Sequence, residues 1–511
     1  MKITIMPVNR IIHTEKELNL LTLLREQKIN ISAPCGGYQK CGKCKVMITL
    51  GNDHDYHCEE MKLLTKEERD LGIRLACCVE TTKDMVVMVM NEDEEKTVTT
   101  TTLHDENMGT NAVGNLSINK HSKEVGIVVD IGTTSIEVVF FDLNGRYKLI
   151  SLVEYNEQRS YGADVVSRIT YCYGNQERVN RLQSILLSQM IRMVMDGAKK
   201  LSISVTQIVR YVIAGNTVMC HLFANKSLDS LAKAPYRPEY LAGEEMSARQ
   251  LKLPGREDTL LYILPIIGGH VGADALACLL AIKNHGGCRL LVDIGTNGEI
   301  LLIKEDIIVA CSTAAGPAFE GAGLNKGMCA KEGAIIHANL VGGKLVYQVV
   351  ANHTPIGISG SGVIDVIACL LRGDYITPDG YFKQGEILSE FVNQADIRQV
   401  QLAKAAIAAG IDRLLSHCEV RAEDLDEFIL AGSFGSNLSI DSATQIGLIP
   451  KLPKENIHAI GNGVVEGAVQ VLYDMVSLSK AKELARKAVH IELSNELGFP
   501  EKFVECMNFP I

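Results

Sequence analysis

The sequence lacks the features that mark exported proteins and proteins that bind nucleic acids in general. Its formal net charge is −10, whereas nucleic-acid-binding domains carry an excess of Lys and Arg. The N-terminal residues 1–5 form too short an apolar run for a signal peptide. We therefore expect no nucleic-acid partner and a cytoplasmic location.

The sequence also lacks a long uninterrupted hydrophobic run. Its most apolar stretch, residues 260–282, contains Pro265, His270, Asp274 and several glycines. A membrane-spanning helix needs about 20 predominantly apolar residues. The interruptions instead favour a strand, a glycine turn and a buried helix, so we expect no membrane association.

The composition is that of a globular protein with an ample core. The chain has 511 residues, of which 47% are hydrophobic and 22% charged, and a chain of this length forms about two to four domains. It contains 15 cysteines. In the reducing compartment expected here, ordered cysteine spacing indicates metal binding rather than disulfides.

One strand–turn–strand pattern occurs twice. Residues 289–303 contain an apolar strand that ends in Asp293, a small polar turn and an apolar return strand. Residues 126–141 repeat this order around Asp130, 163 positions earlier, with the same Asp-Ile-Gly-Thr core. Each copy predicts a β-hairpin, and the repeat predicts two similar half-domains that face each other across a cleft.

The turn residues of both hairpins fit a nucleotide phosphate. Glycine lets the backbone approach a ligand closely, and small polar side chains add donors to exposed N–H groups. An aspartate at the end of a strand fits a hydrated Mg²⁺. The expected phosphate-binding residues are Gly132, Thr133, Thr134, Gly295, Thr296 and Asn297.

Four cysteines near the N-terminus form a specific pattern. Cys35, Cys41 and Cys44 are spaced C-x5-C-x2-C in a glycine-rich loop, and Cys77 follows 33 positions after the third. Three thiolates from a loop and one from a distant strand fit a [2Fe-2S] cluster. A structural zinc site is the alternative, and Cys78 is an alternative to Cys77 as the fourth ligand.

Residues 92–123 change in character. They are rich in Asp and Glu, then in Thr, and finally in Gly, Asn and Ser, with little to bury. This composition predicts a flexible linker. It would allow a small N-terminal domain to move between an electron donor and an acceptor.

The second half contains further small-residue turns. Glu320 in a loop of small residues is either an acid that orients water or Mg²⁺, or a charge at the N-terminus of a helix. The turns at Gly432–Ser433 and Gly461 each follow a predicted strand. Such turns allow a flat purine to pack against backbone, so we expect them to line an adenosine.

In this order, the motifs resemble those of the actin, hexokinase and Hsp70 ATPase superfamily. Asp130-Ile131-Gly132-Thr133-Thr134 is similar to its first phosphate motif, Asp293-Ile294-Gly295-Thr296-Asn297 to its second, and Leu430-Ala431-Gly432-Ser433-Phe434-Gly435 to its adenosine motif. Ser433 stands where the family usually has a second glycine. The resemblance implies an α/β ATPase of two duplicated RNase H-like halves around a nucleotide cleft.

The cysteine pattern resembles that of [2Fe-2S] ferredoxins, and its first gap of five residues is similar to that of the adrenodoxin type. Arg74-Leu75-Ala76-Cys77 matches the segment that carries the fourth ligand in these ferredoxins. The combination resembles the reductive activators of corrinoid proteins. The resemblance implies an α+β ferredoxin-like domain and ATP-driven one-electron reduction of Co(II) to Co(I) in a corrinoid-dependent methyltransferase system. The implied divisions are 1–91 (ferredoxin-like), 92–123 (linker), 124–285 and 286–480 (the ATPase halves) and 481–511 (a C-terminal extension).

The resemblance also implies roles for particular residues and partners. Cys35, Cys41, Cys44 and Cys77 would hold the cluster. Asp130 and Asp293 would act on Mg²⁺ through water, and one of them or Glu320 would orient the attacking water. The expected partners are a corrinoid protein, a low-potential electron donor and a second copy in a homodimer. Two alternatives stay open: a small-molecule kinase with an accessory cluster, and a sensor that binds ATP without hydrolysing it.

Overall fold

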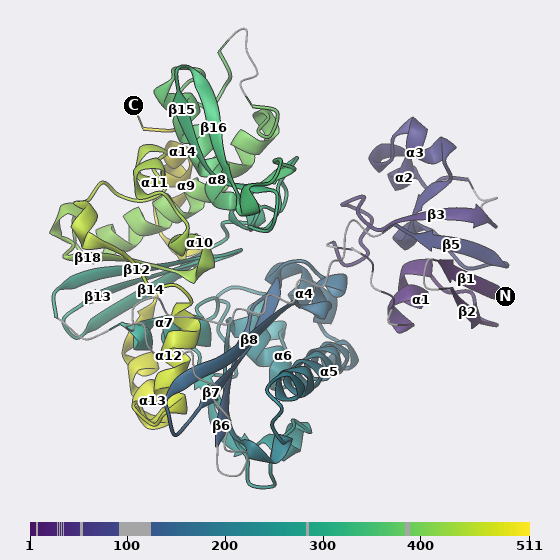
Figure 1. Cartoon of the computed structure of the whole chain (residues 1–511), viewed down its shortest axis with the longest axis horizontal. Coiled ribbons are helices and arrows are strands. Elements are labelled where there is room, and N and C mark those ends of the chain that lie inside the picture. Colours follow the sequence, from purple (N-terminus) through teal and green to yellow (C-terminus); the bar gives the residue numbers. More distant parts are fainter. Residues whose placement is uncertain are drawn as a thin grey trace.

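The computed structural model describes residues 1–6, 9–27, 29, 31, 33, 35–51, 55–90, 124–282, 286–383 and 389–510, and only the backbone of Ser433 and Ser436. The predicted linker, residues 92–123, lies outside the described residues. A small N-terminal domain lies beside a larger part that is built from two α/β halves (Figure 1).

The N-terminal domain is a five-stranded sheet with short helices, in the order β2-β1-β5-β3-β4. Strand β1 pairs antiparallel with β2 and parallel with β5. The alternating pattern of β1 buries Ile3 and Ile5 in one core with the leucines of helix α1. The elements are β1 (Lys2–Met6), β2 (Arg10–His13), α1 (Leu20–Glu26), β3 (Lys45–Leu50), α2 (Cys58–Leu63), α3 (Lys66–Asp70), β4 (Ile73–Leu75), the 3₁₀ helix η1 (Ala76–Cys78) and β5 (Met85–Val89).

Each ATPase half contains a six-stranded sheet, and the two strand orders correspond. The first sheet runs β10-β11-β9-β6-β7-β8 and the second runs β19-β18-β12-β13-β14-β20. In each, an antiparallel meander is extended by a parallel strand, β9 beside β6 and β18 beside β12. The strands are β6 (Val125–Ile131), β7 (Ser135–Asp142), β8 (Tyr147–Tyr155), β9 (Ile208–Gly215), β10 (Ala242–Ser247), β11 (Leu260–Pro265), β12 (Cys288–Ile294), β13 (Gly298–Lys304), β14 (Ile307–Thr313), β18 (Glu427–Ala431), β19 (Ile457–Ala459) and β20 (Ala488–His490).

The register confirms the two predicted hairpins. Asp130 at the end of β6 pairs with Glu137 of β7, and Asp293 at the end of β12 pairs with Glu299 of β13. Each aspartate also pairs with an alanine of the neighbouring parallel strand. The predicted duplicated α/β fold and the separate small N-terminal domain are therefore confirmed.

Helices cover both sheets, and a three-stranded sheet β16-β15-β17 extends the second half. Helix α5 packs on β7 and β8, while α9 packs on β13 and β14. The other α-helices and strands, with two of the 3₁₀ helices, are η2 (Glu157–Tyr161), α4 (Val165–Cys172), α5 (Gln176–Lys200), α6 (Thr217–Phe223), α7 (Ala273–Ala281), η6 (Pro317–Glu320), β15 (Ala334–Val341), β16 (Lys344–Val349), β17 (Gly357–Ile358), α8 (Gly360–Arg372), α9 (Gln394–His417), α10 (Gly432–Ser436), α11 (Ile440–Gln445), α12 (Gly463–Leu472), α13 (Leu478–Lys487) and α14 (Phe499–Met507).

Helices α7 and α12 join the halves in one shared core. Helix α12 follows β19 of the second half, yet it packs against β6 and β9 of the first half as well as against α7. Their core combines Val128 and Val139 of the first sheet with Leu291 and Leu301 of the second. The two halves are thus continuous at this end, because one hydrophobic core serves both.

In the described part of the chain, no helix has both the length and the hydropathy that crossing a bilayer requires.

The closest approach of α7 and α12 depends on Gly467. A Cβ added there would lie 1.6 Å from the carbonyl oxygen of Ala277. We expect Gly467→Ala to push the helices apart, at the upper end of the roughly 1–3 kcal/mol that overpacking costs. This exceeds the gain in helix propensity, about 1 kcal/mol. Calorimetry should show a Tm lowered by roughly 4–8 °C.

Glu466→Ala, at the exposed neighbouring position, is the matched control and should leave the Tm nearly unchanged, as surface substitutions do. A Gly467→Ala protein as stable as this control would contradict the role of the helix contact.

Candidate functional site

The four predicted cluster cysteines lie together in the N-terminal domain as two pairs. The Sγ atoms of Cys35 and Cys41 are 3.4 Å apart, and those of Cys44 and Cys77 are 3.3 Å apart. A tetrahedral metal with metal–sulfur bonds of about 2.3 Å separates its sulfur ligands by about 3.8 Å. Each pair therefore fits one iron of a two-iron cluster.

The loop around the cysteines favours thiolate at its first position. Burial raises the pKa of Cys35, but N–H groups of Lys40, Gly37 and Cys41 and the Cys41 thiol outweigh it and lower the pKa to about 7. The neighbouring Cys77 thiol and burial raise the pKa of Cys44. An iron ion would reverse such a rise, because a coordinating thiol is deprotonated.

The two alternative cysteines are placed less favourably. Cys77 is buried beside Cys44, whereas Cys78 lies half-buried with its Sγ 3.8 Å from that of Cys77. Cys58 is exposed at the start of α2. The geometry supports Cys77 as the fourth ligand.

Cys77→Ser should lose most of the bound iron and the visible absorption of the cluster, because oxygen replaces a buried thiolate ligand. Cys78→Ser is the matched control and should keep both. Iron analysis and absorption spectra of anaerobically purified protein measure the difference. Equal loss of iron and absorption in both variants would contradict the assignment of Cys77, rather than Cys78, as the fourth ligand.

The two predicted phosphate turns meet between the two halves. The hydroxyl oxygens of Thr134 and Thr296 are 3.2 Å apart. Thr296 also donates a 2.7 Å hydrogen bond to Oε1 of Glu320, at the end of η6. Gly295 and Asn297 form the tight turn between them, with Gly295 N–H donating to the Asn297 carbonyl. All the predicted residues of the second turn and Glu320 are thus brought together.

The first turn is fixed by residues behind it. Asn216, the N-cap of α6, donates from Nδ2 to Thr133 Oγ1 at 2.8 Å. Asn156 donates from Nδ2 to the Gly132 carbonyl at 2.9 Å. These contacts fix the Thr133 hydroxyl and the Gly132 carbonyl of the turn.

Four carboxyl groups gather beside the turns. Burial, together with the charges of Glu137, Asp274 and Asp293, raises the pKa of Asp130 well above its usual range. Burial and the Asp293 charge raise the pKa of Asp274 to about 7. Burial raises the pKa of Asp293 to about 6, despite the thiol of Cys278.

Glu299 completes this group, and burial followed by Asp274 and Asp293 raises its pKa well above normal. Mutual repulsion and burial both disfavour the charged forms, and a bound cation relieves both. The residues therefore fit a divalent cation that accompanies a nucleotide.

The predicted adenosine turns lie directly beside Asp293. Gly432 has φ 86° and donates from N–H to the Gly461 carbonyl at 2.8 Å. A Cβ at Gly432 would lie 2.8 Å from Asp293 Oδ1, so a side chain there would crowd the cleft. Ser433 follows in α10, and its side chain lies outside what the structure describes.

Two contacts bridge the halves at the cleft. Asn462, next to Gly461, donates from Nδ2 to Oε2 of Glu137 at 2.6 Å. Tyr155 and Cys329 place their side-chain oxygen and sulfur 3.2 Å apart. Together with the two threonines, they hold the mouth of the cleft by polar contacts.

Three acidic residues of this site were missed in the sequence. Glu137 and Glu299 carry a usable signal, because each stands on the return strand opposite the aspartate of its hairpin. Asp274 lies in the first turn of α7. It reaches the site only because that helix packs in the cleft, so its role had no local signal.

The shifted carboxyl groups predict a pH dependence in protein without magnesium and nucleotide. Between about pH 4 and 7, native Asp274 holds a proton that the unfolded chain has released, so the free energy of unfolding falls as pH rises through this window. Asp274→Asn removes the charge penalty, which is on the order of a few kcal/mol at about 1.4 kcal/mol per pKa unit.

Thermal unfolding from pH 5 to 8 should show the Asp274→Asn variant gaining stability over wild type as pH rises. Asp306→Asn, at an exposed position, should follow the wild-type curve. A constant difference between the Asp274→Asn variant and wild type across this range would contradict the assigned shift.

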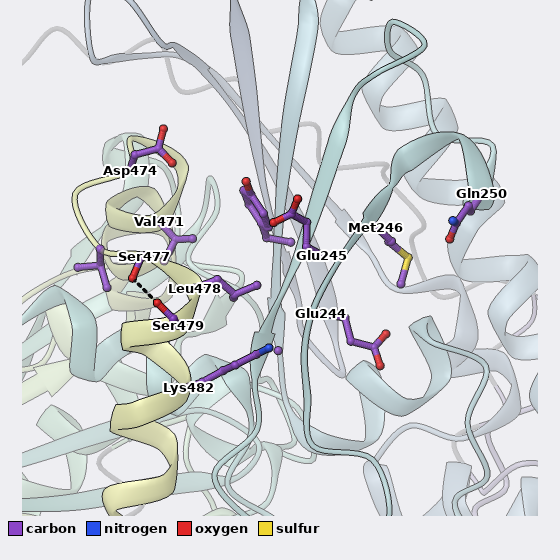
Figure 2. A pocket seen from close by; sticks show the side chains of 13 residues that line it. Glu244, Glu245, Met246, Gln250, Val471, Asp474, Ser477, Leu478, Ser479 and Lys482 are labelled. Atoms are coloured by element: carbon purple, nitrogen blue, oxygen red, sulfur yellow. Dashed lines mark hydrogen bonds between the residues drawn. The ribbon is translucent and has the colours of Figure 1, made fainter.

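A separate cavity of about 790 Å³ lies away from these residues, between β10, β11 and the α12–α13 turn. Figure 2 shows Glu244 and Glu245 on the sheet side, with Asp474 and Lys482 on the helical side. None of the predicted site residues lines it.

Family models match three successive stretches of the chain. They are a 2Fe-2S iron-sulfur cluster binding domain over residues 3–82, the RACo middle region over 125–286, and the C-terminal ASKHA domain of RACo over 287–511. With the paired cysteines and facing phosphate turns, these matches define an ASKHA-type ATPase joined to a [2Fe-2S] domain.

The chain is 32% identical over 434 residues to the corrinoid activation enzyme RamQ of Eubacterium limosum, covering 79% of this chain and 73% of that one. It is 24% identical to the [Co(II) methylated amine-specific corrinoid protein] reductase of Methanosarcina barkeri, over 73% of this chain and 75% of that one. A solved structure titled "Reductive activator for corrinoid,iron-sulfur protein" is 28% identical, with a TM-score of 0.70 and coverage of 100% and 98%. The chain belongs to the RACo family, as its motifs predict.

Proposed function

We propose that this protein uses ATP to activate a corrinoid protein by one-electron reduction of inactive Co(II) to Co(I) in a methyltransferase system. The observation that carries the proposal is one chain that joins two cysteine pairs, each spaced for one iron, to two phosphate turns whose threonine oxygens lie 3.2 Å apart. The names of the two relatives, a corrinoid activation enzyme and a Co(II) corrinoid protein reductase, support this reaction.

Different residues of the cleft would bind the phosphates, the adenosine and the magnesium ion of ATP. Backbone and hydroxyl groups of the two turns would hold the phosphates, and Gly432, Ser433 and Gly461 would line the adenosine. Asp130 and Asp293 would hold a hydrated Mg²⁺ through water. In the described residues, no three His, Cys, Asp or Glu side chains converge into a preformed metal cage. A magnesium ion that enters with the phosphates and keeps several waters needs none.

Glu320 is placed to act through Thr296. Its Oε1 accepts the Thr296 hydroxyl, so the carboxylate is held at the phosphate turn and would orient the attacking water beside it. If Asp130 or Asp293 lies closer to the γ-phosphate than Glu320 does, that aspartate would orient the attacking water instead.

The N-terminal domain would supply the electron. When bound, the [2Fe-2S] cluster provides a one-electron carrier, and Cys35, Cys41, Cys44 and Cys77 hold it. For one electron, an unfavourable gap of about 60 mV costs about 1.4 kcal/mol. An uphill transfer of a few hundred millivolts therefore needs an input of the size that ATP hydrolysis gives.

The partners follow from this chemistry. The acceptor would be a corrinoid protein of a methyltransferase system, and a low-potential carrier would reduce the cluster. A homodimer is part of the same expectation. The closing of the cleft around ATP would change the surface that the corrinoid protein meets.

The test mixes anaerobic protein with a Co(II) corrinoid protein and a low-potential reductant, with ATP or without it. Co(I) absorbance should appear only with hydrolysable ATP. Asp293→Asn should keep the cluster spectrum and lose ATP turnover by about 10²-fold or more, the size expected for a group that stabilises transition-state charge. Asp306→Asn is the matched control and should retain both.

Co(I) formed equally without ATP would contradict the proposal. ATP turnover that depends on a small-molecule acceptor instead would identify a kinase, and ATP binding without turnover would identify a sensor.

A further inference from the structure

Arg25 of α1 contacts both the cysteine loop of the iron–sulfur domain and the first ATPase half. Its Nη1 donates to the carbonyl of Gly36 at 3.2 Å, inside the cysteine loop. Its Nη2 donates to the carbonyl of Ser160 in η2. Its guanidinium carbon lies 4.7 Å from the centroid of the Tyr161 ring. One side chain therefore contacts both the cluster loop and the ATPase.

The backbones also meet at this point. A Cβ on Gly36 would lie 2.9 Å from the carbonyl oxygen of Tyr161, so the residue after Cys35 packs directly on η2. Tyr161 is 5% exposed, and Arg181 of α5 lies 5.7 Å from the centroid of the same ring. Figure 1 shows the N-terminal domain beside the α4 region of the first half. This surface, formed by Ser160 and Tyr161, is called the docking site below.

The docking site is tied to the first phosphate turn by two fully buried side chains. Asn156, the N-cap of η2, donates from its backbone N–H to the Thr134 carbonyl and from its Nδ2 to the Gly132 carbonyl, each at 2.9 Å. Arg168 of α4 donates from Nη2 to the carbonyl of Thr133. All three carbonyls of the turn are thus held by groups on the docking side.

Arg168 also holds the two ends of η2. Its Nη1 donates to Gln158 Oε1 at 3.2 Å, and its Nε donates to the Gly162 carbonyl at 2.9 Å. Both Arg168 and Asn156 are 0% exposed. Burying a guanidinium is costly, and burial lowers its pKa to about 9. The hydrogen bonds to the turn and to η2 offset this cost.

Because peptide bonds are planar, a movement of the N–H groups of the phosphate turn also moves the carbonyls that Asn156 and Arg168 bind. The carbonyl of Gly132 and the N–H of Thr133 belong to one rigid planar unit, and so do the carbonyl of Thr133 and the N–H of Thr134. A phosphate that draws these N–H groups toward the cleft tilts the same units. The tilt lengthens the hydrogen bonds to Asn156 and Arg168 on the other side.

We propose that Asn156 and Arg168 are positioning residues that couple nucleotide in the cleft to release of the iron–sulfur domain from the docking site. Phosphate on the turn loosens η2, which weakens the hold of Ser160 and Tyr161 on Arg25 and frees the cysteine loop to meet an acceptor. The inference rests on the proposed function for the identity of the ligand, ATP, and adds how its binding reaches the other domain.

The chain contains no tryptophan, so one introduced residue gives an unmixed signal. Tyr173→Trp places a reporter at the C-cap of α4, where Tyr173 is exposed, and the iron–sulfur chromophore quenches it when the domain is docked. All measurements use the full-length holoprotein in this background, with iron content checked in each variant. The probe is a non-hydrolysable ATP analogue with magnesium, and its binding is measured separately by calorimetry.

In the reporter protein, the analogue should relieve quenching, with a shift in the docking equilibrium of about 5-fold or more, the lower end of typical allosteric coupling. Arg25→Gln should relieve quenching with or without the analogue. Arg10→Gln is the matched control, because Arg10 donates to the Gln27 carbonyl of its own domain, and it should behave as the parent.

Asn156→Ala and Arg168→Lys separate coupling from folding. Each should bind the analogue yet lose most of the fluorescence response, whereas a merely structural role would leave the response of a folded variant unchanged. If Arg168→Lys fails to fold, Asn156→Ala alone decides. Quenching that Arg25→Gln leaves intact would overturn the docking site.

Analogue binding in the parent without a change in fluorescence would overturn the coupling and leave the proposed function standing. Failure of the parent to bind any adenine nucleotide would overturn the proposed function, and the coupling with it.

Discussion

Repulsion among buried carboxyl groups is the constraint on which the ATPase part depends. Asp130 and Asp293 end equivalent strands, and burial, followed by the charges of neighbouring carboxyl groups, raises the pKa values of Asp130, Asp274 and Glu299. Such a group is tolerated only where the surrounding packing holds it in place. The shared core beneath it, with α7 and α12, provides that packing.

The contacts between the halves are of two kinds, and they lie at different places. At the base, an apolar core combines side chains of both sheets. At the mouth, the contacts are polar: Thr134 with Thr296, and Asn462 with Glu137. A hydrogen bond contributes only about 1 kcal/mol net, whereas separating the core would expose many apolar side chains. The polar contacts between the halves are therefore easier to break than the shared core.

The sequence predicts what is local. Both hairpins, the cysteine loop and the turn at Gly432 are short segments whose residue order specifies their conformation, and the repeat of Asp-Ile-Gly-Thr predicts the duplicated fold. Spacing alone does not choose between Cys77 and Cys78, because adjacent residues have nearly the same spacing to the loop. The resemblance of Arg74-Leu75-Ala76-Cys77 to the ferredoxin segment favours Cys77, and the turn of η1, which buries Cys77 and leaves Cys78 half-exposed, agrees with that choice.

Contacts between distant segments could not be predicted, because local residue order does not specify a distant partner. Asn462 and Glu137 are 325 positions apart, and Arg25 and Ser160 are 135 apart. Nothing in the residues around either partner indicates the other. The position of Asp274 could not be predicted either, because it lies near the other three carboxyl groups only through the packing of its helix. The polar contacts between distant segments of the site are thus a property of the tertiary fold.

The packing of α12 has a consequence for how the chain is made. The first half emerges from the ribosome with the face of β6 and β9 that α12 covers still exposed, because roughly 180 further residues separate α7 from α12. At about 5–20 residues per second, this interval lasts about 10–40 s. The nascent chain therefore carries this apolar surface for that time before α12 can cover it.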